Sequence, residues 1–391
     1  MTEFSYLCSR KRQKSLLEIM KEMQFGATML MALLTLKLLL LPIRPADRFS
    51  LGRTRWLMAA GTGGLAVQFA LQYALQLRTA GLVASALMIN FSFFIPCSSF
   101  MALGILYLLR RDHVTQLDRF ISFPIWFIAL TLLGYGLGTS GEEMLIDTPQ
   151  LRWGEAAAGV LYAGLNFYYF FRHIHELRLL RDALADYYDR DTDGILSWME
   201  VSIILLAVIA LIIPPLLFTN GWWLFVFSVI IVCAIFYMVD SFCFYVASKG
   251  PRRVNAMEQN EKELNKQDAE APAGNEEMDM EAMRHVERAV EQWIARGGHL
   301  KSGLIQPVAA EEIGVKQYML RAWLTTQGLR YNDWLTLLRI DEAKRILQAH
   351  PEWNNETIAL HCGFGDRSAF QKKFKDKTGM TPAEFQAKYK S

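Results

Sequence analysis

Seven apolar stretches of 18 to 29 residues occupy most of the first 247 residues of the chain. A helix needs about 20 apolar residues to cross the hydrocarbon core of a bilayer, which is ~30 Å thick. The stretches therefore predict membrane-spanning helices at 25–43, 56–76, 81–109, 120–139, 155–172, 201–219 and 222–247. The expected fold class is all-α, with a polytopic transmembrane helix bundle at 25–247 and a second helical part after it.

Basic residues gather in alternate connections between these stretches. They follow the first, third, fifth and seventh spans, whereas the other connections hold only Arg78 and Arg152. Cytoplasmic loops carry an excess of Lys and Arg, so the pattern predicts a multi-pass membrane protein with a cytoplasmic C-terminus. These residues are Arg44, Arg48, Arg53, Arg55, Arg110, Arg111, Arg119, Arg172, Arg178, Arg181, Arg190, Lys249, Arg252 and Arg253.

The first 24 residues do not fit this orientation. They form a basic segment that would resist transfer across a membrane. One explanation is a mis-assigned start, with translation beginning at Met20 or Met23. The alternative is a cytoplasmic N-terminus with one span misassigned. The basic residues of the segment are Arg10, Lys11, Arg12, Lys14 and Lys21.

Six polar or ionisable side chains lie deep within the predicted spans. Such groups are costly in hydrocarbon and mark candidate functional positions. Lys37 and Asp240 fall in the half of their spans nearer the cytoplasm, where they could form an ion pair. The alternative is that Lys37 reaches the interface by itself and Asp240 faces a hydroxyl of a neighbouring helix. The other four are Gln68, Gln72, Asn90 and Asn166.

The sequence DRDTDGILSWME at 189–200 matches the calcium-loop pattern D-x-D-x-D-G-x5-E. In such a loop the oxygen ligands would come from Asp189, Asp191, Asp193, the carbonyl of Ile195 and a bidentate Glu200. The alternative is an acidic turn that caps the helix of the sixth span. A calcium ion is therefore one expectation for this loop, and no other cofactor is expected.

The stretch 248–280 loses the apolar pattern and is rich in acidic residues. Such a composition cannot bury a core, which predicts an acidic flexible linker. Part of it could be helical, because Glu258 and Lys262 stand four positions apart. Helical periodicity returns after it, with Val286, Val290, Trp293 and Ile294 on one face. Residues 281–391 are therefore expected to form a separate domain.

Two helix-turn-helix units are predicted in this domain. The first has a short helix that ends at Gly314, and the second has its turn at Gly363 after a helix capped by Asn355. A long helix at 331–349 joins them, and Asp366 starts a second recognition helix at 367–377. Candidate DNA-binding side chains on the two recognition helices are Lys316, Gln317, Tyr318, Arg321, Arg367, Ser368, Gln371, Lys372 and Lys375.

The sequences LRIDEAKRIL at 338–347, IALHCGFGDRSAF at 358–370 and FKDKTGMTP at 374–382 resemble the AraC/XylS-type DNA-binding domain. The resemblance covers about 100 residues and is stronger over the second unit. The first departs from the family pattern at Gly314, which follows Ile313 directly. The resemblance to this family implies that the two recognition helices enter successive major grooves of double-stranded DNA and that the protein contacts RNA polymerase. Membrane spans stand in place of the family's usual soluble partner domain, an arrangement that resembles membrane-bound members of this family in bacteria and implies a location in the bacterial inner membrane.

The expected function is that of a membrane-embedded, sequence-specific transcription regulator, with activation implied by the resemblance. The spans would act as an anchor, or would sense a small-molecule or protein signal, and the chain could form a homodimer. The alternative is a membrane transporter or receptor whose cytoplasmic tail is a signalling module. No catalytic set of residues is visible in the sequence, so an enzyme is not expected.

Overall fold

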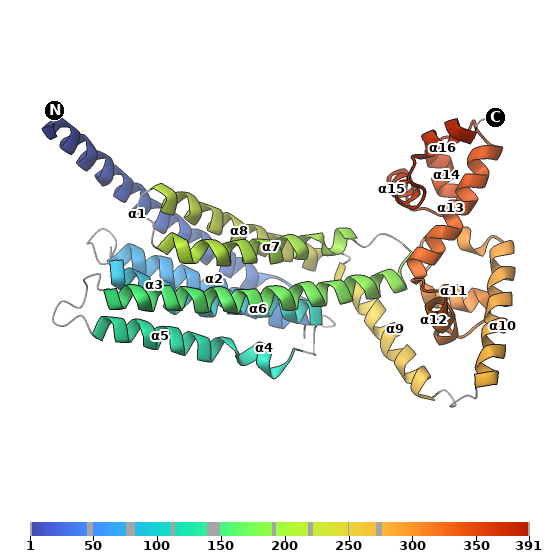
Figure 1. The fold of residues 1–391 in the computed structure, drawn as a ribbon, viewed down its shortest axis with the longest axis horizontal. Helices are drawn as coiled ribbons and strands as arrows, with labels where there is room; N and C mark the ends of the chain where they lie inside the picture. Colours follow the sequence, from blue (N-terminus) through green and yellow to red (C-terminus); the bar gives the residue numbers. More distant parts are fainter. Residues whose placement is uncertain are drawn as a thin grey trace. The chain divides into compact units, whose positions relative to one another are not determined.

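The computed structural model describes residues 2–44, 50–75, 83–110, 114–138, 149–189, 193–217, 222–248, 250–270 and 276–389. Every regular element in these ranges is a helix (Figure 1). The chain divides into two compact units. The first holds residues 1–178 and 197–249, and the second holds residues 179–196 and 250–391.

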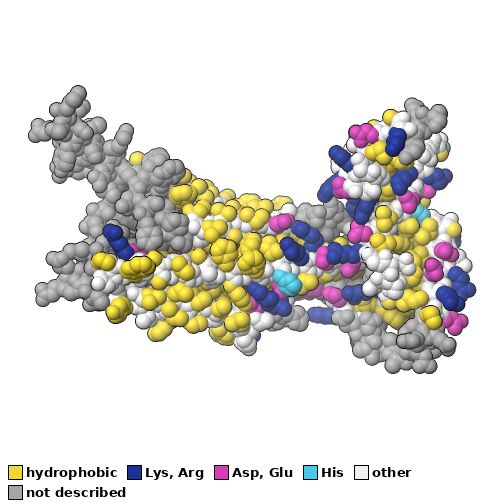
Figure 2. Space-filling view, viewed as in Figure 1, with side chains coloured by type: hydrophobic (Ala, Val, Ile, Leu, Met, Phe, Trp, Pro, Cys, Tyr) yellow, Lys and Arg dark blue, Asp and Glu magenta, His cyan; other side chains and the backbone are white. Residues whose placement is uncertain are grey.

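The first unit is built from long helices that pack along one another (Figure 1). The most extensive contacts join α1 to α2 and α2 to α3, and α3 also packs on α5. Apolar side chains cover most of the visible face of this unit, whereas Lys, Arg, Asp and Glu are frequent on the visible face of the second unit (Figure 2). The helices are α1 (Thr2–Leu40), α2 (Ser50–Leu75), α3 (Val83–Arg110), α4 (Gln116–Phe120), α5 (Ser122–Gly138), α6 (Pro149–Tyr187), α7 (Asp193–Leu217) and α8 (Trp222–Ala247).

Five helical segments in the described residues are long and apolar enough to cross a membrane: Lys21–Leu40, Met88–Arg110, Gln116–Tyr135, Leu196–Ile213 and Phe225–Ala247. All seven stretches expected from the sequence overlap helices. The two that fall outside this set, 56–76 and 155–172, lie in α2 and α6. Their crossing of a membrane stays a prediction.

Helix α2 owes its lower hydropathy to polar side chains that point into the unit. Thr62, Gln68 and Gln72 are all buried. Thr62 is 2.8 Å from the hydroxyl of Thr35 on α1, and Gln68 donates to Asn90 on α3 at 2.8 Å. Hydropathy alone cannot distinguish such inward polar groups from groups that face lipid.

The stretch 248–280, expected to be a linker that is helical in part, is helical over most of its length. Residues Gly250–Glu270 form helix α9, and α10 begins at Glu276. Val254, Met257 and Leu264 are buried on one face of α9. Met257 follows Val254 by three positions and Leu264 follows Met257 by seven, so the three side chains lie on one face of the helix. An otherwise charged segment therefore has an apolar face that can pack. The compact second unit also begins earlier than residue 281, because it includes α9 and residues 179–196.

The second unit continues with short helices on two apolar cores. The elements are α10 (Glu276–Ala295), a 3-10 turn η3 (Gly298–Leu300), α11 (Gln306–Ile313), α12 (Gln317–Thr326), α13 (Tyr331–Ala349), α14 (Asn355–His361), α15 (Arg367–Thr378) and α16 (Pro382–Tyr389). Helix α13 contacts α12 near one end and α14, α15 and α16 along the other. It therefore joins two small helical modules.

Candidate DNA interface

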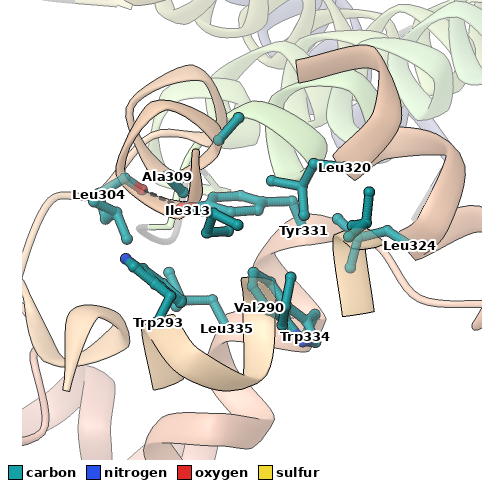
Figure 3. Close-up of a cluster of buried hydrophobic side chains, with 12 residues drawn as sticks. Val290, Trp293, Leu304, Ala309, Ile313, Leu320, Leu324, Tyr331, Trp334 and Leu335 are labelled. Carbon is teal, nitrogen blue, oxygen red and sulfur yellow. Dashed lines mark hydrogen bonds between the residues drawn. The ribbon is translucent and has the colours of Figure 1, made fainter. Parts of the chain in front are cut away.

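The first module has a core of apolar side chains from α10, α11, α12 and α13 (Figure 3). Trp293 of α10 stacks on Trp334 of α13 with ring centroids 5.9 Å apart. The buried hydroxyl of Tyr331 donates to the carbonyl of Leu304 at 3.2 Å, so the ring is held without an unpaired polar group. Trp323 of α12 packs edge-on against Trp334 with ring centroids 5.9 Å apart, and this contact fixes α12, the first recognition helix, against α13.

A tight turn connects α11 to α12. Gly314 has φ 86°, a left-handed conformation that only glycine adopts without strain. Its amide donates to the carbonyls of Ala310 and Glu311, which closes the end of α11. Gly314, where the first helix-turn-helix departs from the family pattern, therefore serves as the C-terminal cap of α11.

The second module places α14 and α15 around a core that includes four phenylalanines, Phe364, Phe370, Phe374 and Phe385. Asn354 caps α14, because its side-chain oxygen accepts hydrogen bonds from the amides of Glu356 and Thr357. The cap thus lies one residue before the Asn355 expected from the sequence. Asp366 caps α15 by accepting from the amide of Ala369 at 2.8 Å, as expected.

Helix α13 holds the two modules together. Trp334 and Leu335 belong to the first core, and Ile340 and Ile346 belong to the second. Because one continuous helix contributes to both cores, the two recognition helices have a fixed spacing within this unit. This geometry suits a protein that reads two segments of one groove.

The recognition helices present most of their candidate side chains outward. On α15, Arg367, Ser368, Lys372 and Lys375 are exposed and Gln371 is half-buried. Arginine can pair bidentately with guanine, and lysine can neutralise phosphates. The acidic cap of α15 lies at its N-terminus and Lys375 and Lys377 lie in its last turn, an arrangement that the helix dipole favours.

The first recognition helix is less open. Lys316 and Arg321 are exposed, whereas Gln317 and Tyr318 are half-buried. Gln317 exchanges two hydrogen bonds with Asn260 of α9, at 2.9 Å and 2.8 Å, and also donates to Gln306 at 2.9 Å. A side chain expected to contact DNA is therefore held by the protein itself.

Arg339 is buried and only 3% exposed. It lies on α13 between the residues of this helix that pack in the first core and those that pack in the second. Its guanidinium donates to the carbonyls of His299 and Lys301 at 2.9 Å and 2.6 Å and to the carboxylate of Asp189 at 3.0 Å. Asp189 also accepts from the amide of Leu304 at 2.9 Å. The sequence reasoning missed Arg339, and the signal in the sequence was a lone arginine on the apolar stripe of 331–349.

The residues of the expected calcium loop are thus partly used otherwise. The Asp189 carboxylate pairs with Arg339, Asp191 lies outside the described residues, and the side chains of Asp193 and Ile195 are also outside them. Helix α7 already begins at Asp193, and half-buried Glu200 lies within it. In the part of the chain that the structure describes, no three His, Cys, Asp or Glu side chains gather as metal ligands.

The polar residues expected at membrane depth all have partners in the first unit. The predicted ion pair is confirmed, with Lys37 Nζ 2.5 Å from the Asp240 carboxylate. Asn90 accepts hydrogen bonds from Gln68 and Gln72. Asn166 donates to the carbonyl of Tyr162 in its own helix at 2.8 Å.

Comparison with known proteins identifies the C-terminal region. Residues 309–388 match the family model of a helix-turn-helix domain. No curated protein and no solved structure matches the chain significantly. The matched residues include both turns, both recognition helices and α13. The C-terminal part is therefore an AraC-type helix-turn-helix domain, and the chain is a DNA-binding transcription regulator.

Proposed function

We propose that this protein is a membrane-embedded regulator that binds specific promoter sequences from the cytoplasmic side of a bacterial inner membrane. The observation that carries the proposal is the joining of an exposed basic recognition helix, α15, to a unit with five helices long and apolar enough to cross a bilayer. A chain with both must keep its C-terminal domain on the side where the chromosome lies.

In this proposal the protein activates transcription through contact with RNA polymerase. The first unit serves as an anchor or as the receiver of a small-molecule or protein signal, in contact with membrane lipid. A homodimer held by the spans would bring two domains to neighbouring sites and raise their effective concentration. The proposed binding partner is double-stranded DNA, and the proposal involves no catalytic step.

The test is genome-wide crosslinking of the full-length protein to DNA in its own cells. Arg367→Ala removes an exposed arginine from the start of α15 and should abolish discrete promoter peaks. Arg288→Ala, an exposed arginine of α10, is the matched control and should leave the peaks unchanged. Messenger RNA levels of the neighbouring genes then show the sign of regulation.

The second candidate is a transporter or receptor with a signalling tail. It is favoured by the buried polar cluster of Gln68, Gln72 and Asn90 within the first unit. Peaks that are absent, or that persist in Arg367→Ala, would support this candidate against the first.

A further inference from the structure

Both amide atoms of Gln317 are occupied by other residues of the second unit. Its Oε1 accepts from Asn260, and its Nε2 donates to Asn260 and to Gln306. A glutamine that reads an adenine uses both of these atoms, one as acceptor and one as donor. The contact with α9 and base readout by Gln317 therefore exclude each other.

The end of α6 approaches the same module with acidic side chains. Asp182 forms an ion pair with Arg330 at 2.6 Å. Asp186, one turn further along α6, lies near both Arg330 and Arg321. Carboxylates beside these arginines lower the positive potential that DNA phosphates need.

The segment after α6 extends this contact. Tyr188 forms an antiparallel bridge with Ile305, just before α11. The hydroxyl of Tyr188 donates to the carbonyl of Arg253 on α9 at 3.0 Å, which ties the end of α6 to α9. The buried pair of Asp189 and Arg339 then fixes the segment to α13.

The contact is incompletely packed. A cavity of about 210 Å³ lies between the end of α6, α9 and the first module. It is lined by Tyr187, Met257, Gln306, Gln317 and Arg321, among others. The pocket is open to solvent and lined partly by polar groups, so water can replace the hydrogen bonds between α9 and α12 when the contact opens. The second recognition helix, in contrast, presents Arg367, Ser368 and Lys375 as exposed side chains.

We propose that α9 and the end of α6 form an autoinhibitory clamp on the first recognition helix. The clamp and DNA compete for α12, while α15 remains open. The resting protein holds DNA through the second module alone, and release of the clamp lets the first module engage as well. This inference rests on the proposed function, because it assigns a regulation to the same DNA-binding site.

The test uses the full-length chain in detergent micelles. The DNA probe is a set of duplexes selected from a random-sequence library by the Asn260→Ala variant. Asn260→Ala removes both hydrogen bonds to Gln317, and Met257→Asp places a charge on the buried face of α9 as an independent way to open the clamp. The matched control is Gln259→Ala, an exposed amide on the same helix.

Both opening variants are expected to bind the selected duplexes at least about fivefold more tightly than the unchanged chain, as two net hydrogen bonds would allow. Their footprints should cover two segments about 10 base pairs apart, where the unchanged chain and Gln259→Ala cover one. Hydrogen exchange should rise in α9 and stay low in α13, which shows that the domain remains folded.

Equal affinities and equal footprints for all of these chains would overturn the clamp. The addition of Arg367→Ala to each variant distinguishes this failure from a failure of the proposed function. If Arg367→Ala weakens every chain while Asn260→Ala and Met257→Asp change nothing, DNA binding stands and the clamp is rejected. If Arg367→Ala weakens none of them, the DNA-binding role of α15 and the clamp that depends on it are both rejected.

Discussion

At the scale of single residues, the buried ion pair of Arg339 and Asp189 stands out, because the two side chains are 4% and 2% exposed. Removal of one partner leaves the other charged in the interior, which costs about 3–5 kcal/mol. We expect Arg339→Met to lower the free energy of opening of α13 by that amount, measured by hydrogen exchange on the full-length chain.

The double variant Asp189→Asn with Arg339→Met tests the cause. It removes both charges and should recover most of the protection that Arg339→Met loses. The same loss in the single and the double variant would show that Arg339 acts through its bonds to the carbonyls of His299 and Lys301 instead.

The buried imidazole of His299 predicts a pH dependence. Burial lowers the pKa of His299 below its usual value of 6.5. The unfolded chain therefore takes up a proton at a higher pH than the folded chain does. The stability is fully present above the unfolded pKa and is lost as the pH falls through the folded pKa. Carboxyls with a lowered pKa, such as Glu312 and Glu342, titrate below 4.5 and do not contribute in this window.

Protection of peptides at 290–304 against hydrogen exchange, corrected for the intrinsic rate, should fall between about pH 7.5 and about pH 5.5. His299→Gln should flatten this dependence. An unchanged slope in the variant would assign the effect to another group.

At the scale of elements, the turn between α14 and α15 allows a specific prediction. Gly363 has φ 77°, and a Cβ there would lie 2.4 Å from the carbonyl oxygen of Leu300, which is backbone and cannot move aside cheaply. Gly379 has a similar φ of 75°, but a Cβ there would have no atom within 4 Å. Gly379→Ala therefore measures the backbone strain alone.

We expect Gly379→Ala to cost about 1 kcal/mol and Gly363→Ala clearly more, about 2–4 kcal/mol, in thermal unfolding of the full-length chain. Gly363→Ala should also weaken DNA binding, because the turn orients α15. Equal effects of the two substitutions would mean that η3 shifts to make room.

The elements of this domain could be predicted because their signals are local. Helix α13 runs from Tyr331 to Ala349 and α15 begins at Arg367, as caps and apolar periodicity indicate. Contacts between distant segments carry no such pattern. Asp189 and Arg339 are 150 positions apart, and Asn260 and Gln317 are 57 apart. For the same reason Asp189 suggested a metal ligand, and 248–280 suggested a linker.

At the scale of the whole molecule, the open prediction is whether α2 crosses the membrane. Its 26 residues span about 39 Å, enough for a bilayer core, and its buried Thr62, Gln68 and Gln72 are bonded inside the first unit rather than exposed to lipid. We therefore expect reporter enzymes fused after residue 47 and after residue 79 to lie on opposite sides of the membrane, with a reporter at the C-terminus in the cytoplasm as the reference. Lys37 and Asp240 both lie near the C-terminal ends of their helices. Their pairing at one depth in the membrane therefore requires α1 and α8 to cross in the same direction. Fusions after 47 and 79 on the same side would make α2 a helix that does not cross, and the span count would fall accordingly.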